Sequence, residues 1–184
     1  MKAYTVNQLK AEFARLGYVW SDTFNLIGIR SAADAPNKFD DTFILYRKIG
    51  EIPDIYTFPN TTNPGTTYLQ RLLNPKGAAV LKPGQYVNAW SFGLHRGKYE
   101  ALCQVRPVTV WRDKDKDLKS EVGPEDRGLF GINIHKAATG ISALINGNSA
   151  GCQVFQRSAD FDFVMKLCKA SGIKQFTYTL LNEF

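Results

Sequence analysis

The stretch Gly131-Ile132-Asn133-Ile134-His135 alternates apolar and polar residues, and Ser149-Ala150-Gly151-Cys152 follows it after a short connection. The alternation predicts a strand that ends at one of the two histidines of the chain. Asn146-Gly147-Asn148, just before the second stretch, predicts a turn rather than a buried central strand. A cysteine behind small residues leaves room for a carbonyl carbon, with main-chain N–H groups available to an oxyanion. The two stretches together indicate a cysteine acyl-transfer site.

Cys152 and His135 are the residues on which this chemistry would depend. A thiolate is a good nucleophile, and a neutral imidazole can take the proton of the thiol and later return it. The alternative is structural, because a lone cysteine is usually a small core residue and His135 could be a satisfied core histidine. Cys103 lies in a strand pattern and Cys168 in a helical pattern, so we expect both of these in the core.

The pair Ile134-His135, its separation from the cysteine, and Ser149-x-Gly151-Cys152 resemble the catalytic signature of the L,D-transpeptidase (YkuD-type) family. The similarity covers 128–157, with weaker support from Gly84-Gln85-Tyr86. It implies that Cys152 is the nucleophile, that His135 is the general base, and that the backbone amides of Gly151 and Cys152 form the oxyanion hole. The chain departs from the family pattern at Lys136 and Ala150, which replace a glycine and a histidine, and at Gln153-Val154, where an arginine or asparagine is usual. It resembles a divergent member, of the kind that a phage could encode.

The length of 184 residues, with 44% hydrophobic and 22% charged residues, fits one globular domain over 1–184. Helical spacing predicts a helix over 6–17, capped by Thr5, and a second helix through Ala170 that is capped by Ser158. Short β-branched and aromatic runs predict the strands. We expect these at 24–29, 42–46, 55–58, 86–92, 99–105, 108–111 and 175–181, with loops at 59–65, 93–98 and 112–127. The fold class is therefore mainly β with flanking helices (α+β), and the resemblance implies a β-sandwich or barrel catalytic domain.

The resemblance implies that the substrate is the peptide stem of bacterial peptidoglycan, attacked at the carbonyl between an L-centre and the following D-residue. The cysteine would form a thioester. Water as the acceptor would give a lysin-like L,D-peptidase or carboxypeptidase, whereas a second amine would give a transpeptidase that cross-links stems or exchanges D-amino acids. Two non-catalytic alternatives stay open: a wall-binding module, suggested by Trp20, Trp90 and Trp111, and a phage structural component. The sequence leaves the oligomeric state undetermined.

Four residues are candidates for binding the substrate. Arg30 and Arg157 could each grip a stem carboxylate through bidentate contacts. Ser149 belongs to the signature beside the nucleophile. His95, in a glycine-flanked segment beside Arg96, is either an exposed loop histidine or a substrate contact at the rim of the cleft.

We predict neither a metal nor another cofactor. The alternating carboxylates from Asp113 to Asp117 suggest a calcium loop, but Leu118 and Pro124 occupy the positions of its glycine and its bidentate glutamate. A solvated loop is the better interpretation. A zinc site from His95, His135, Cys152 and Asp41 lacks any zinc-binding spacing.

The net charge of +6 comes from scattered Lys and Arg residues, without a nucleic-acid motif, so we expect no nucleic-acid partner. No apolar run is long enough to span a bilayer. Residues 1–7 lack the apolar core of a secretory signal, and three cysteines do not form a complete disulfide framework. We therefore expect synthesis in the cytoplasm and action on the cell wall after release or export, which favours hydrolysis over wall building.

Overall fold

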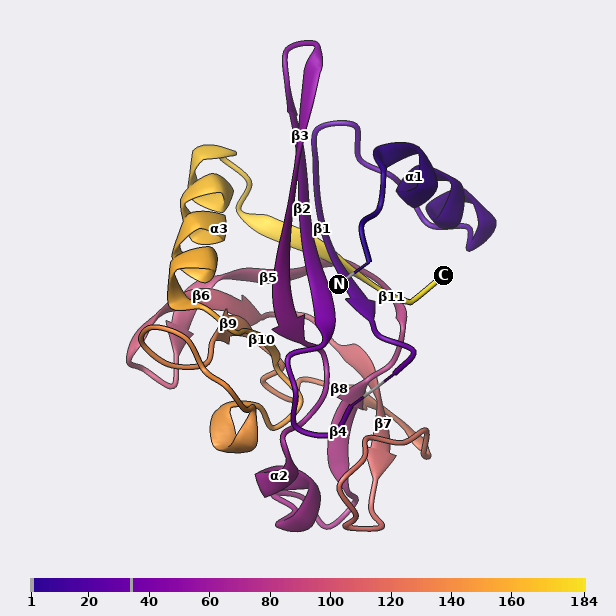
Figure 1. The fold of residues 1–184 in the computed structure, drawn as a ribbon, viewed down its shortest axis with the longest axis vertical. Helices are drawn as coiled ribbons and strands as arrows, with labels where there is room; N and C mark the ends of the chain where they lie inside the picture. The colour runs from indigo at the N-terminus through magenta and orange to yellow at the C-terminus, as the bar shows by residue number, and fades with distance from the viewer. Residues whose placement is uncertain (1, 34) are drawn as a thin grey trace.

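In the computed structural model, which describes residues 2–33 and 35–184, eight strands close into a barrel (Figure 1). Around the barrel the order is β1, β11, β5, β6, β9, β10, β3, β2. Their bounds are β1 Phe24–Arg30, β2 Asp41–Ile49, β3 Ile52–Thr61, β5 Gly84–His95, β6 Tyr99–Gln104, β9 Ile134–Lys136, β10 Gln153–Phe155 and β11 Gln175–Asn182. A separate sheet contains β4 Ala78–Leu81, β7 Val108–Asp113 and β8 Glu125–Gly128. The prediction of a mainly β fold is confirmed.

β1 and β2 are buried on both faces, which explains their nearly continuous apolar sequences. Leu26 and Phe43 point into the main core inside the barrel, whereas Ile27 and Ile44 belong to a second core outside it. Helix α1, Val6–Arg15, covers this second core, into which it packs Leu9 and Phe13. The outer face of this part of the barrel is therefore shielded from water by the N-terminal helix.

The two predicted helices are present, and their first turns differ in how they are capped. Thr5 caps α1 with a capping box, in which its side chain accepts from the Gln8 N–H and the Gln8 side chain accepts from the Thr5 N–H. Helix α3, Ser158–Ala170, has Arg157 at its N-cap, so the prediction of Ser158 as the cap was wrong by one residue. The hydroxyl of Ser158 accepts instead from the Gly140 N–H at 2.9 Å. A short third helix, α2, Thr66–Gln70, was not predicted from the sequence.

Several predicted loops contain strands. β3 continues to Thr61, β5 continues to His95, and the charged stretch 112–127 includes part of β7 and β8. Conversely, of the residues 131–135 that were predicted to form a strand, only Ile134 and His135 belong to one, β9. The residues before it are held by side chains: Gln104 Oε1 accepts from Ile132 N–H at 3.0 Å, and Trp90 Nε1 donates to the Ile132 carbonyl at 2.7 Å.

Figure 1 shows where these parts lie relative to one another. Helix α3 lies along one side of the barrel and α1 on the other, and the β2–β3 hairpin projects beyond both as a narrow arm. α2 and the separate sheet lie at the opposite end. Within the described part of the chain, no helix has both the length and the apolar character needed to cross a lipid bilayer.

Candidate functional site

The two signature residues lie on neighbouring elements. β9 and β10 pair in parallel, with Val154 opposite His135. Ile134 and Phe155 point into the main core, so the alternation of side chains directs His135 and Val154 to the outer face. Cys152 immediately precedes β10 and packs against Val154 on that face. The barrel thus holds the cysteine and the histidine on one side of two adjacent strands.

The thiol of Cys152 is held by the backbone of the segment before β9. Its Sγ accepts from the Asn133 N–H at 3.4 Å and donates to the Gly131 carbonyl at 3.5 Å. The residue is only 8% exposed, and burial raises the pKa of the thiol to about 11, although the Asn133 N–H acts in the opposite direction. In this buried position the sulfur is a neutral thiol.

The imidazole of His135 is held in one tautomer. Its Nδ1 lies 2.8 Å from the Lys136 carbonyl oxygen, which can only accept, so Nδ1 carries the proton. Tyr99 donates its hydroxyl to the same carbonyl at 3.1 Å, and burial and the nearby Cys152 raise the pKa of Tyr99 to about 12. Nε2 therefore keeps a lone pair, and this buried atom has no hydrogen-bond partner among the described residues.

Burial, followed by the charge that His95 would carry, lowers the pKa of His135 to about 3. His135 is therefore neutral at physiological pH. A neutral imidazole with a free Nε2 lone pair has the protonation state that a general base requires.

His95 lies at the site, although not in the environment that its flanking glycines suggested. It is the last residue of β5, is 7% exposed, and stacks on His135 with ring centroids 3.9 Å apart. The prediction of an exposed loop histidine was wrong, and His95 contacts the imidazole of His135 rather than the rim of an open cleft. Tyr99 and Asn133, whose side chains bond to His135 and His95, respectively, were not predicted as site residues from the sequence.

The turn before Cys152 has a packing role. Ser149 is fully buried; its hydroxyl donates to the Cys152 carbonyl at 2.9 Å and accepts from the Gly151 N–H at 3.2 Å. Ser149 therefore closes the turn, which corrects its assignment to substrate binding. The same bond engages the Gly151 N–H, so of the two predicted oxyanion donors the Cys152 N–H is the one that remains.

Of the two arginines predicted to grip a substrate carboxylate, Arg30 is buried and Arg157 is exposed. Arg30 is buried, and its guanidinium donates to the Thr62 hydroxyl at 2.9 Å and to the Leu81 carbonyl at 2.8 Å. A carboxylate from solvent cannot reach it, so that assignment is corrected. Arg157 is exposed at the start of α3, where its backbone pairs with Ile141.

The candidate zinc ligands do not converge. Asp41 is fully buried and accepts from the Ser31 and Thr62 N–H groups. Within 2–33 and 35–184, the carboxylates of Asp115, Asp117 and Glu121 form the one group of three or more potential ligand atoms close enough to share an ion, and all three residues are exposed. These three carboxylates lie in the exposed segment that connects β7 and β8.

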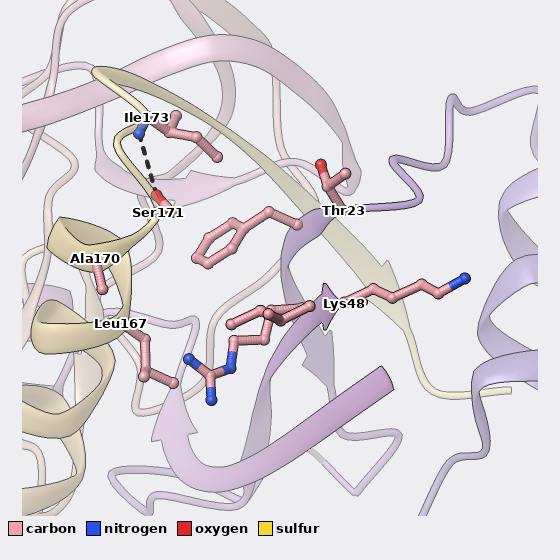
Figure 2. A pocket seen from close by; sticks show the side chains of 9 residues that line it. Thr23, Lys48, Leu167, Ala170, Ser171 and Ile173 are labelled. Atoms are coloured by element: carbon pink, nitrogen blue, oxygen red, sulfur yellow. Dashed lines mark hydrogen bonds between the residues drawn. The ribbon is translucent and has the colours of Figure 1, made fainter. Parts of the chain in front are cut away.

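Several hollows lie outside the thiol site, and two of them border α3. One, of about 470 Å³, adjoins Tyr99 and Lys136 and is bordered on its other side by α3, including Lys166 and Lys169. The other, of about 390 Å³, lies between the last residues of β2, next to the turn of the β2–β3 hairpin, and the end of α3; Figure 2 shows Leu167, Ala170 and Ile173 around it, with Lys48 extending away. The first hollow is the one that shares residues with the surroundings of His135.

A scan against protein-family models, a search of curated proteins and a search of solved structures found no match to this chain.

Proposed function

We propose that this protein is a cysteine-dependent hydrolase of the L,D-transpeptidase type that acts on the peptide stems of bacterial peptidoglycan. One observation carries the proposal: the Cys152 thiol and a neutral His135, with its Nε2 lone pair unused, lie on the same face of adjacent strands. The resemblance of the surrounding sequence to the L,D-transpeptidase signature supports the choice of substrate.

The reaction proceeds through a thioester. His135 Nε2 takes the proton as Cys152 Sγ attacks the stem carbonyl carbon, and the Cys152 N–H donates to the developing oxyanion. The C–N bond then breaks, and the departing amine of the D-amino acid receives the proton from His135. Water attacks the thioester, again with His135 as base, and releases a carboxylate and the free thiol. An amine in place of this water gives the transpeptidase outcome.

Both reacting groups are neutral in their buried positions, so proton transfer accompanies attack on the carbonyl rather than preceding it. The hollow beside Tyr99 and Lys136 suits an anionic stem, because Lys136, Lys166 and Lys169 line it and stem carboxylates carry negative charge. Glu100 and Asp162 in the same hollow pair with Lys169 and Lys136, respectively, which leaves Lys166 as the side chain best placed to meet a carboxylate.

The burial of Cys152 favours a second candidate, a non-catalytic wall-binding or phage structural module in which the thiol only packs. Mass spectrometry of purified muropeptides separates the two functions. The wild-type protein should remove a D-residue from the stems, Cys152→Ala should release none, and Cys103→Ala, which changes a half-buried thiol on β6, should behave like the wild type. Unchanged muropeptides with the folded wild-type protein, or full activity in Cys152→Ala, would refute the enzyme.

A further inference from the structure

Asn133 contacts both halves of the candidate site. Its backbone N–H donates to Cys152 Sγ at 3.4 Å, and its carbonyl accepts from the Gln153 N–H at 2.9 Å. Its side-chain Oδ1 accepts from the Gln104 N–H at 3.0 Å, which identifies Nδ2 as the group that faces His95 Nδ1 at 3.1 Å. All four polar groups of this residue are therefore used, and two of them point to the thiol and to a histidine.

The same bond fixes the state of His95. Nδ2 of an amide can only donate, so His95 Nδ1 accepts and the proton of this neutral ring is on Nε2. The ring then lies on that of His135, with planes inclined by 24°. The Nδ1–H bond to Lys136 holds one edge of the His135 ring, and the His95 ring covers one face. The hydrogen bond and the ring stacking therefore restrict different motions of the His135 imidazole.

We propose that Asn133 and His95 are positioning residues: Asn133 bonds to the Cys152 thiol with its backbone and orients His95 with its side chain, and His95 holds the ring of His135. The proposal rests on the proposed function, because it assigns these residues to the nucleophile and base of that reaction. Neither residue needs to touch the substrate.

The charged and titratable groups around His135 determine how its pKa should respond when the His95 ring is removed. His95 and Arg96 come from the β5–β6 hairpin, Tyr99 from β6, Lys136 from β9, and Cys152 from the start of β10. Burial is the main cause of the lowered pKa of His135, and the charges of His95 and Arg96 act in the same direction. Removal of the His95 ring should admit water to the exposed face of His135 and raise its pKa, whereas another aromatic ring should keep the water out.

The test compares His95→Ala, His95→Phe and Asn133→Ala, with Asn182→Ala at an exposed end of β11 as the control. Imidazole ¹⁵N NMR reports the tautomer and titration of His135 without any need for turnover. In the wild type and the control, His135 should show the Nδ1–H tautomer and no titration between pH 5 and pH 8. In His95→Ala it should titrate within that range, and in His95→Phe it should not.

Muropeptide kinetics supply the second readout. His95→Ala should lower kcat about tenfold or more with KM changed less than threefold, His95→Phe should recover most of that loss, and Asn133→Ala should lower kcat by a smaller factor. His135 signals that are identical in His95→Ala and the wild type would overturn the proposal. So would a kcat that His95→Phe and His95→Ala lower equally. If the wild type does not act on muropeptides, the proposed function fails, and the NMR comparison still decides whether His95 holds His135.

Discussion

Asn37 and Asn146, which lie 109 residues apart in the chain, are joined by two hydrogen bonds. Asn37 Nδ2 donates to Asn146 Oδ1 at 2.7 Å, and the Asn146 N–H donates to Asn37 Oδ1 at 2.6 Å. The connected segments carry Phe39 and Ile145, which pack together with Cys152 and Val154. This pair of asparagines thus ties together the two segments that cover the thiol.

Replacement of Asn37 by glycine should expose Cys152. Glycine removes the side chain and still suits the backbone, since φ at Asn37 is 62°. Loss of the two hydrogen bonds to Asn146, at about 1 kcal/mol each, corresponds to roughly a thirtyfold increase in the population in which the two segments separate. The longer bond from the Thr66 N–H to Asn37 Oδ1, at 3.4 Å, is lost as well. Alkylation of Cys152 by iodoacetamide, followed by peptide mass spectrometry, should therefore accelerate by about ten- to thirtyfold.

The matched control is Asn88→Gly, because Asn88 also has a positive φ of 52° and lies on β5. It should leave the Cys152 rate unchanged. Cys103, which is less buried than Cys152, serves as the internal reference thiol in every variant. Equal Cys152 rates in the Asn37 and Asn88 variants would show that this pair does not control access.

A second prediction concerns the small residue before the cysteine. Gly151 has φ +122°, and a Cβ there would lie 2.1 Å from the Ala79 carbonyl oxygen of β4. The backbone at Gly151 or at Ala79 would have to move to relieve this contact. Gly151→Ala should therefore lower the free energy of unfolding by about 3 kcal/mol or more. Gly147→Ala is the control, since its nearest neighbour would be a Thr67 methyl group at 4.0 Å. Urea unfolding should separate the two variants, and equal stabilities would contradict the close approach of this turn to β4.

Local patterns of apolar residues in the sequence predicted several of the helices and strands. The spacing of Leu9 and Phe13, together with Thr5, was enough to predict α1, and the apolar runs of β1 and β2 predicted both strands. β9 and β10 have only three residues each, and their extended state depends on pairing with each other and with β6 and β3. Such strands carry little signal of their own, since the pairing that stabilises them is non-local.

The distinction between local sequence pattern and non-local pairing applies to the candidate site as well. The pattern of small residues and one histidine was sufficient to select Cys152 and His135, which the fold then brings to one face. The environment of His95 was not predictable, because its neighbour His135 is 40 positions away on another strand. Arg30 was misassigned for a similar reason: the Thr62 and Leu81 oxygens that hold it come from other parts of the chain.

A third prediction tests the buried polar cluster around Asp41. Its carboxylate accepts from the Ser31 N–H at 2.8 Å and from the Thr62 N–H at 2.6 Å, and the Arg30 charge lies close enough to favour the ionised form. Asp41→Asn would turn an NH₂ group toward one of these donors and remove the charge that balances Arg30. We expect a loss of about 3–5 kcal/mol in the free energy of unfolding at pH 7.

Asp40→Asn is the neighbouring control for Asp41→Asn. The Asp40 carboxylate is only half-buried and accepts from the Ala35 N–H, so we expect its loss to cost about 1 kcal/mol. Chemical denaturation measures both variants. Equal effects at the two positions would mean that burial of the Asp41 carboxylate contributes nothing specific.

The last prediction concerns pH. The pKa of His135 falls from 6.5 to about 3 on folding, so between these values the unfolded chain binds more protons than the folded chain. The free energy of unfolding should therefore fall as the pH drops below 6.5, by up to about 1.4 kcal/mol per pH unit from this group. Asp41 has the opposite sign, since burial raises its pKa from 3.8 to about 6 and the folded chain then binds the extra proton.

The two contributions overlap between pH 3.8 and pH 6, so the wild-type profile alone cannot separate them. His135→Gln removes one of them and keeps a polar side chain. The stability difference between the wild type and this variant should shrink by about 1.6 kcal/mol in total as the pH falls from 6.5 to 5. The variant should itself show a weaker acid-induced destabilisation, to which His95 still contributes because burial lowers its pKa too, set against the stabilising trend of Asp41. Urea denaturation at four pH values measures this, and a difference that is independent of pH would mean that His135 is not held neutral by the fold.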